Sequence, residues 1–261
     1  MARNVADLAG QNRSLTELRA IGPFIEKQIR QWLDKPPPLS TKIPAIRQDF
    51  ISLAEARQLL ARKAVWSKNL RGDLQMHTRW SDGSGTIAEM ADAAKELSYE
   101  HIAITDHSKG LKIGGGINED ALWKQRSAIA KINSSLLKAG AKLTVLHSIE
   151  MNLNARREGD MSPKSLLPLD LVLGSFHSSL RALEIDCYPD RQDLNVGLLK
   201  VAREHGTRIS IGTDAHHPWQ LEFIKLGLAA ALKTKISSHQ IINFMSISDL
   251  RNWVKQTRQR S

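Results

Sequence analysis

Short apolar segments of the chain end repeatedly in histidine or in a carboxylate. The residues at five such ends are His77, Asp106, His107, Glu150, His177, Asp214 and His216. Imidazole and carboxylate groups together suit Zn, Mn or Fe ions, and burying unpaired carboxylates would be costly. A single strand-end histidine is more often a hydrogen-bonded structural residue, but this collection favours a metal site.

The elements before these residues must bring them together. Apolar, β-branched segments at 72–78, 101–107, 143–151, 170–178, 182–188 and 208–216 have the pattern of strands, and helical patterns at 87–98, 119–140 and 195–206 lie between several of them. Such alternation predicts parallel strands in an α/β architecture. The C-terminal ends of parallel strands converge on one face, so the predicted ligands should share one site.

The first 34 residues predict a small helical element. Ser14 and Glu17 have the spacing of a capping box, and Pro23 can open an amphipathic helix over 24–33. The proline-rich segment from Lys35 predicts a linker, and residues 51–66 predict one bridging helix. We therefore expect a helical element at 1–34, a linker with a bridging helix at 35–66 and the main domain at 67–261.

Composition narrows the class of protein. The chain has 261 residues with a net charge of +10, which suits a polyanionic partner such as nucleic acid, although many cytoplasmic proteins are basic without binding one. Its single cysteine, Cys187, rules out an internal disulfide and fits a reducing cytoplasm. No apolar stretch approaches a membrane span, and the N-terminus lacks the apolar core of a secretory signal. We expect no membrane association.

The motifs and their order resemble the PHP (polymerase and histidinol phosphatase) domain. The likeness rests on "GDLQMHTRWSDG" at 72–83, "IAITDHS" at 102–108, the segment ending at Glu150, "SFHSSL" at 175–180 and "GTDAH" at 212–216. It is greatest to the PHP domain at the C-terminus of bacterial family X DNA polymerases. Residues 14–29 resemble a helix-hairpin-helix element of those polymerases more weakly. Only the proline-rich linker lies where their catalytic palm should be, so we expect no polymerase activity.

The resemblance implies a distorted (β/α) barrel of seven strands that holds up to three metal ions and hydrolyses phosphoesters. Carried over residue by residue, it implies the metal ligands His77, Asp82, His107, Glu150, His177, Asp214 and His216. Glu150 resembles the carboxylate that bridges two metals, and with Asp214 and His216 it would form the catalytic group. The expected cofactors are divalent Mn, Zn or Fe ions.

The sequence departs from the family pattern at two places. Gln75 stands where the family has the first histidine of an HxH pair, although some family X polymerase domains resemble this chain there. The family also supplies a histidine from a strand after the one that holds His177, and this chain has none. Ser178 to Arg181 are too few for the crossover of about a dozen residues that joins neighbouring parallel strands. We therefore expect an incomplete barrel with fewer than three tightly bound metal ions.

These features together predict a metal-dependent phosphoesterase that attacks with metal-activated water. DNA ends are the expected substrate, with 3′–5′ exonuclease or 3′ phosphatase activity. Candidate substrate-binding residues are Arg79, Lys109 and Arg191, and candidate DNA-binding residues are Gly22, Lys27 and Arg30. Two alternatives stay open: a small-molecule phosphatase of the histidinol-phosphate type, and a degenerate DNA-binding PHP module without catalysis. The oligomeric state does not follow from the sequence.

Overall fold

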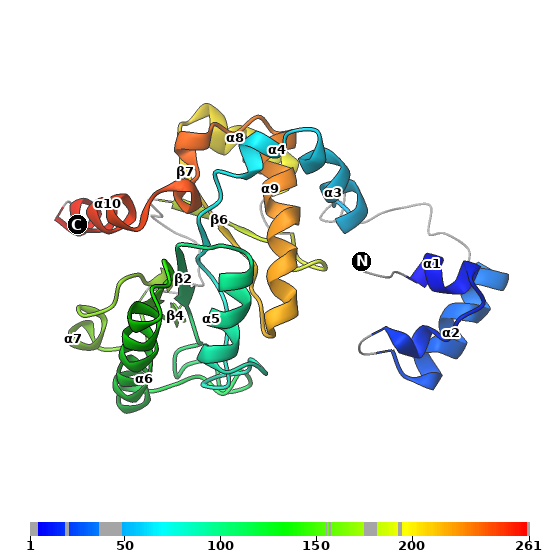
Figure 1. The fold of residues 1–261 in the computed structure, drawn as a ribbon. Helices are drawn as coiled ribbons and strands as arrows, with labels where there is room; N and C mark the ends of the chain where they lie inside the picture. The colour runs from blue at the N-terminus through cyan, green and yellow to red at the C-terminus, as the bar shows by residue number, and fades with distance from the viewer. Residues whose placement is uncertain are drawn as a thin grey trace. The chain divides into compact units, whose positions relative to one another are not determined.

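The computed structural model describes residues 5–18, 21–36, 49–154, 156, 158–174, 182–192 and 195–259 (Figure 1). The chain divides into two compact units, Met1–Gln48 and Asp49–Ser261, and each is described by itself. No helix in the described ranges is long and apolar enough to cross a membrane.

The first unit contains the helices α1 (Val5–Gly10) and α2 (Pro23–Asp34) and a 3-10 turn, η1 (Leu15–Glu17). The helix expected from Ser14 is only this turn, and the expected capping box is wrong. Glu26 from α2, rather than Glu17, accepts hydrogen bonds from the backbone N–H of Leu15 (3.0 Å) and from Oγ of Ser14 (2.8 Å). Ser14 still caps the turn, because its Oγ accepts from the backbone N–H of Thr16 (3.2 Å), and Glu26 takes the second role that the local sequence assigned to Glu17.

The second unit is built on parallel strands, as the alternating pattern predicts. A three-stranded sheet has the order β1 (Gly72–Asp73), β2 (His101–Ile104) and β3 (Thr144–His147). Two parallel pairs accompany it: β4 (Glu150–Met151) with β5 (Leu173–Gly174), and β6 (Ala182–Asp186) with β7 (Arg208–Gly212). The single strand expected over 143–151 is thus interrupted between β3 and β4.

Two isolated parallel bridges continue the strand order beyond these sheets. Met76 pairs with Ala215, which joins the end of β7 to the segment after β1, and His107 pairs with Glu150, which joins the end of β2 to β4. The succession is therefore β6, β7, β1, β2, then β3 and β4, then β5. Within the described residues no bridge joins β5 to β6. The segment 175–181, which includes His177, lies outside the described residues.

Helices surround these strands. The described set is α3 (Leu53–Ala61), α4 (Ala64–Ser67), α5 (Ile87–Glu96), α6 (Glu119–Lys138), α7 (Pro163–Leu166), α8 (Val196–Glu204), α9 (Ile224–Lys233) and α10 (Ile247–Gln259), with 3-10 turns η3 (Pro218–Phe223), η4 (Ser238–Gln240) and η5 (Ile242–Phe244). The one bridging helix expected over 51–66 is two helices, because Lys63 leaves the helical region with φ −133° and ψ 43°.

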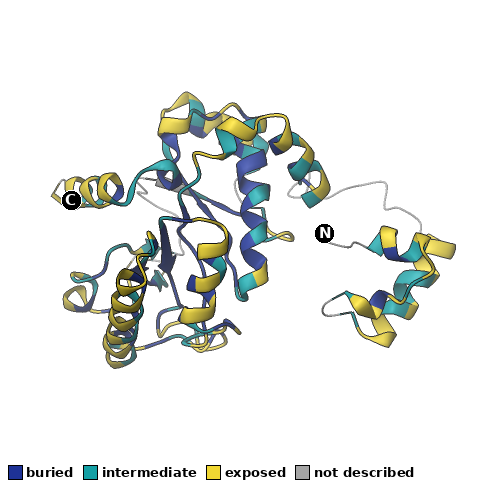
Figure 2. Ribbon diagram, viewed as in Figure 1, coloured by how far each residue is buried: buried dark blue, intermediate teal, exposed yellow. Residues whose placement is uncertain are grey.

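Burial follows the predicted patterns in the helices that flank the strands. Thr86 and Glu89 form a capping box that starts α5, and this helix buries Ile87, Met90 and Ala94. One core cluster packs α5 and α6 against β2 and β3, and another packs α3, α8 and α9 against β6 and β7. Figure 2 shows buried residues along the strands and α9 and exposed residues along α6. The strand ends are thereby held in register.

Candidate metal centre

The segment that carries His77 is held between two neighbouring strands. The backbone N–H of His77 donates to the carbonyl of Ala215 (2.8 Å), and that of Thr105 donates to the carbonyl of Met76 (2.9 Å). His77 is fully buried at this position. The turn that follows returns Asp82 toward the histidine and needs Gly83, because a Cβ there would lie 2.5 Å from the backbone of His77.

Asp106 organises the same turn, and the sequence did not reveal this role. The buried carboxylate accepts hydrogen bonds from Thr78, through both N and Oγ1 at 2.7 Å, from Oγ of Ser81 at 2.6 Å and from Nε2 of Gln125 at 2.6 Å. Its oxygens therefore have protein donors and are not directed at the candidate metal ligands. The only sequence signal was its place directly before His107.

Asp214 and His216 follow β7 in an unusual backbone geometry. Asp214 has φ 53°, in the left-handed region that residues other than glycine adopt uncommonly and aspartate more readily than most. Nδ1 of His216 lies 2.7 Å from the carbonyl of Asp214, and its backbone N–H donates to Oε1 of Gln220 (2.7 Å). Because Nδ1 faces a carbonyl, it carries the proton and leaves Nε2 of His216 as a free ligand atom.

His77 lies at the centre of the candidate ligands. Its Nε2 atom is 2.9 Å from Oδ1 of Asp214 and 3.4 Å from Oε2 of Glu150. Its other nitrogen, Nδ1, is 3.8 Å from Oδ1 of Asp82. Because the two nitrogens lie on different sides of the ring, His77 belongs to two groups of candidate ligands at once.

The two groups are His77, Asp82, His107 and His216, and His77, Glu150 and Asp214. Within each group the candidate ligand atoms all lie within 4.8 Å of one another. Asp82 approaches both other histidines of its group, with its oxygens 3.4 Å from Nε2 of His107 and 3.4 Å from Nε2 of His216. His107 also links the groups, because its Nδ1 atom is 3.4 Å from Oε2 of Glu150.

The chemistry of these atoms fits a divalent cation. Within the described residues, Nδ1 of His77, Nδ1 of His107 and Oε1 of Gln75 are buried without a hydrogen bond, whereas Nε2 of His77 contacts Oδ1 of Asp214 at 2.9 Å. A buried polar atom without a partner costs roughly 1–3 kcal/mol, and coordination to a metal would remove that cost. Nitrogen and carboxylate donors together suit Zn, Mn or Fe.

Burial and the clustered charges shift the pKa values of these groups. Burial raises the pKa of Glu150 above its ordinary value. Burial opposes protonation of His77, but the nearby carboxylates, Asp214 first among them, outweigh it and raise the pKa of His77. Burial and the charge of His77 together lower the pKa of His107 to about 4. His107 is therefore a neutral ligand at pH 7, whereas a metal must compete with a proton for His77.

The ligand groups open into a pocket of about 360 Å³. Its lining consists of Asp82, His107, Leu111, Ile113, Gly114, Arg191, Asp214 and His216. Arg191 is the cation in this lining, with Nη1 3.3 Å from Oδ2 of Asp214 and 3.5 Å from Oδ2 of Asp186. The pocket therefore combines candidate metal ligands with a positive group suited to an anion.

A family model for the PHP domain matches residues 73–216, which is more than half of the chain. The chain belongs to the PHP family. It is also 27% identical over 239 residues to a protein named DNA polymerase/3′-5′ exonuclease PolX from Bacillus subtilis (strain 168), a match that covers 72% of this chain and 41% of that protein. The resemblance to family X polymerases is thereby confirmed, and the chain spans about two fifths of this relative.

A solved histidinol phosphate phosphatase from Lactococcus lactis subsp. lactis Il1403, complexed with Zn, L-histidinol and phosphate, is also similar. The TM-score is 0.42 and the identity 13%, over 64% of this chain and 95% of that one. The PHP match and the parallel strands described above give this chain a PHP-type α/β fold.

Gln75, where the sequence comparison led us to expect a histidine, lies beside the candidate ligand Glu150. Its Nε2 atom is 3.4 Å from Oε2 of Glu150. On its other side the chain passes Gly212, where a Cβ would lie 2.1 Å from Oε1 of Glu184 and 2.7 Å from Oε1 of Gln75. Burial raises the pKa of Glu184 well above its ordinary value. Gly212 is therefore enclosed by the side chains of Gln75 and Glu184, and a larger residue would not fit there.

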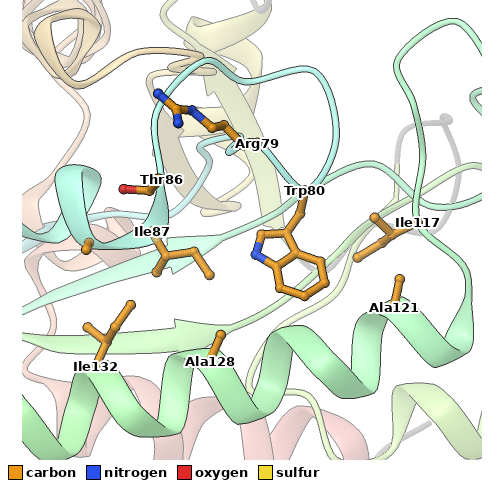
Figure 3. Close-up of a pocket in the computed structure, with 9 residues that line it drawn as sticks. Arg79, Trp80, Thr86, Ile87, Ile117, Ala121, Ala128 and Ile132 are labelled. Atoms are coloured by element: carbon orange, nitrogen blue, oxygen red, sulfur yellow. The ribbon is translucent and has the colours of Figure 1, made fainter.

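Two of the three predicted substrate-binding residues, Lys109 and Arg79, do not line this pocket. Nζ of Lys109 pairs with Glu119 at 2.7 Å, and Nε of Arg79 donates to the carbonyl of Ser84 at 2.8 Å. Arg79 lines a different pocket of about 390 Å³ between the 79–88 segment and α6, where Trp80 and Ile117 lie above the helix (Figure 3). Of the three predicted cations, the structure brings only Arg191 to the ligand groups.

The predicted DNA-binding residues lie in the first unit. Gly22 is the N-cap of α2 and Lys27 is exposed on that helix. Arg30 donates to Glu26 at 2.9 Å and to the carbonyl of Arg13 at 2.6 Å, so its guanidinium is partly engaged. The predicted ligand His177 lies outside the described residues.

Proposed function

We propose that this PHP protein is a metal-dependent phosphoesterase that hydrolyses DNA ends, as a 3′–5′ exonuclease or a 3′ phosphatase. The observation that carries the proposal is the pair of ligand groups that share His77, four of whose residues line the same pocket as Arg191: Asp82, His107, Asp214 and His216. Buried nitrogens without hydrogen bonds are costly in a purely structural cluster, and they support metal binding.

The proposed ligands are the residues of the two groups, together with His177 on the evidence of its sequence motif. Glu150 is proposed to link the two groups, since its Oε2 atom is 3.4 Å from nitrogens of both His77 and His107. When bound, divalent ions supply Lewis-acid polarisation of the phosphoester and acidify water. The proposed catalytic group is Glu150, Asp214 and His216.

The pocket supports attack by water rather than by a side chain. Among the described residues its lining contains no serine, threonine or cysteine, and Cys187 is fully buried elsewhere. Arg191 is proposed to bind the phosphate, because its guanidinium reaches the pocket while 59% of the side chain stays exposed. Lys109 and Arg79 do not line this pocket and are the weaker candidates.

DNA is proposed as the partner for two reasons. The chain carries a net charge of +10, and the relative with 27% identity is named as a DNA polymerase and 3′-5′ exonuclease. The backbone N–H groups at Gly22 would meet a DNA phosphate, with Lys27 and Arg30 adding positive charge. The proposal includes a cytoplasmic location, which the single cysteine favours.

We also propose that the barrel is incomplete and holds fewer than three metal ions tightly. This rests on the short connection from Ser178 to Arg181 and on the edges at β5 and β6 within the described residues. Oε1 of Gln75 is a poorer ligand for transition metals than an imidazole nitrogen would be. We expect activity to need added Mn or another divalent ion.

One observation favours a small-molecule phosphatase as the second candidate. The pocket of about 360 Å³ lies in the range that holds a small phosphomonoester. An experiment that distinguishes the two candidates incubates the protein with 3′-labelled single-stranded DNA and, separately, with histidinol phosphate. Each substrate is tested with Mn and with a chelator. If the label is released from DNA in a chelator-sensitive way and histidinol phosphate is not hydrolysed, the result supports the DNA-end enzyme. Hydrolysis of the small ester alone contradicts it, and salt-dependent DNA binding without hydrolysis indicates the degenerate module.

A further inference from the structure

The loop between His107 and Ile117 is closed over the pocket by its own hydrogen bonds. The N–H of Ile117 donates to the carbonyl of His107 (2.8 Å), and the N–H of Gly116 donates to that of Leu111 (3.1 Å). Asp160 holds the loop from outside by accepting from Oγ of Ser108 at 2.7 Å. The ends of the loop meet as in a compact Ω-loop, so its apex has a defined place.

Glycine lets this loop approach the candidate ligands. A Cβ on Gly114 would lie 2.9 Å from Cδ2 of Leu111, 3.0 Å from Cδ2 of His107 and 3.1 Å from Oδ2 of Asp82. The loop backbone therefore packs directly against one ligand group. Leu111 and Ile113, which precede Gly114 in the loop, form the apolar part of the pocket lining.

Ile113 is exposed to an unusual degree for a pocket residue. The residue is 95% exposed, although it lines a pocket that, besides Leu111 and Gly114, holds histidines, carboxylates and an arginine. An exposed isoleucine is unremarkable by itself, but here it stands with Leu111 at the edge of a charged site. A phosphoester bound to the ligand groups and Arg191 would place its organic group beside this apolar rim.

We propose that Leu111 and Ile113 contact the face of the terminal nucleobase and so select nucleotide ends over simple phosphate esters. The proposal rests on the proposed function at DNA ends. A nucleobase is flat and apolar on both faces, and enzymes that act on extruded or single-stranded bases hold them between apolar or aromatic side chains. The contact carries no hydrogen bonds, so it favours a base at the terminal position without selecting its identity.

The test compares two single-stranded oligonucleotides that differ only at the 3′-terminal residue. One ends in 2-aminopurine and the other in an abasic tetrahydrofuran residue, and a terminal phosphorothioate linkage slows hydrolysis of both. Affinity for the full chain is measured with Mn present, for the unsubstituted protein and for Ile113→Ser, Leu111→Ser and the control Leu137→Ser. Leu137 is 79% exposed on α6 and does not line the pocket. Leu137→Ser therefore replaces an exposed aliphatic side chain by serine, as the other variants do, but outside the pocket.

We expect the unsubstituted protein and Leu137→Ser to prefer the base-ended oligonucleotide about tenfold, and Ile113→Ser to lose most of that preference. Equal affinity of the unsubstituted protein for both oligonucleotides overturns the inference, as does a preference that Ile113→Ser retains. Hydrolysis of 3′-labelled DNA without base preference overturns this inference alone. Base preference without hydrolysis overturns the proposed activity alone. Binding of neither oligonucleotide overturns both.

Discussion

Replacing Glu150 by glutamine tests the metal centre with almost no change of shape. Oε2 of Glu150 lies 3.4 Å from Nε2 of His77, from Nδ1 of His107 and from Nε2 of Gln75. Glu150→Gln keeps the volume and removes the charge that would neutralise a bound cation. Substituting even an outer partner of a metal ligand costs about 10–100-fold in affinity, so we expect a loss of about 100-fold for this carboxylate.

The loss of affinity converts into a thermal shift of known size. A metal present at 100 times its dissociation constant stabilises the folded state by about 2.7 kcal/mol. If the site becomes 100-fold weaker at the same metal concentration, this stabilisation falls to about 0.4 kcal/mol. For a unit of this size, about 2.3 kcal/mol corresponds to roughly 5–9 °C in Tm. The metal-dependent rise in Tm should therefore nearly vanish in Glu150→Gln.

The metal-free protein should respond in the opposite direction. Burial raises the pKa of Glu150, which means that its charged form is disfavoured in the folded state without a metal. A neutral amide avoids this cost, so the Tm of chelator-treated Glu150→Gln should equal or exceed that of the unsubstituted protein. Differential scanning fluorimetry with and without Mn, together with metal analysis, measures both effects. Glu96→Gln, exposed on α5, is the control. An undiminished metal-dependent rise in Tm for Glu150→Gln would refute the assignment.

Three further predictions concern other parts of the chain. Gln75→His should raise metal affinity by about tenfold, because imidazole is a better ligand than an amide, and should raise the hydrolysis rate only partly. Calorimetric titration with Mn measures the affinity, and an unchanged affinity would contradict the prediction. Removing residues 1–34 should weaken binding to all DNA sequences and make the affinity less dependent on salt, as measured by fluorescence anisotropy. If the full chain and the truncated chain have the same salt dependence, residues 1–34 do not bind DNA. Burial lowers the pKa of His101 to about 4. Below the ordinary histidine pKa of about 6.5, the unfolded chain therefore binds a proton at His101 that the folded state does not bind. The free energy of unfolding should fall for this reason as the pH drops from about 6.5 toward 4. Urea unfolding measures the free energy of unfolding at pH 7 and at pH 5, and His101→Asn should reduce the difference between the two values by about 2 kcal/mol. An unchanged difference would show that His101 does not cause the loss of stability.

The sequence alone determined the placement of most candidate ligands. His77, His107, Glu150, Asp214 and His216 follow apolar segments, and parallel strands bring such ends together whatever the details of packing. Helices α5, α6 and α8 likewise formed where the apolar periodicity predicted them, because each buries one face against the strands. These features depend on local spacing and strand direction, which are written in the order of residues.

The tertiary structure decided everything that depends on pairs of residues far apart in the chain. Asp106 gathers donors from Thr78, Ser81 and Gln125, and Arg191 rather than Lys109 or Arg79 reaches the pocket. No local pattern distinguishes three exposed cations or reveals which buried aspartate already has its donors. The same reason explains why Glu26 rather than Glu17 supports the start of η1 and why the loop over His107 presents its apolar residues to the pocket. Hydrogen bonds and close packing form only between groups that the completed fold brings within a few ångströms, and sequence spacing does not encode that proximity.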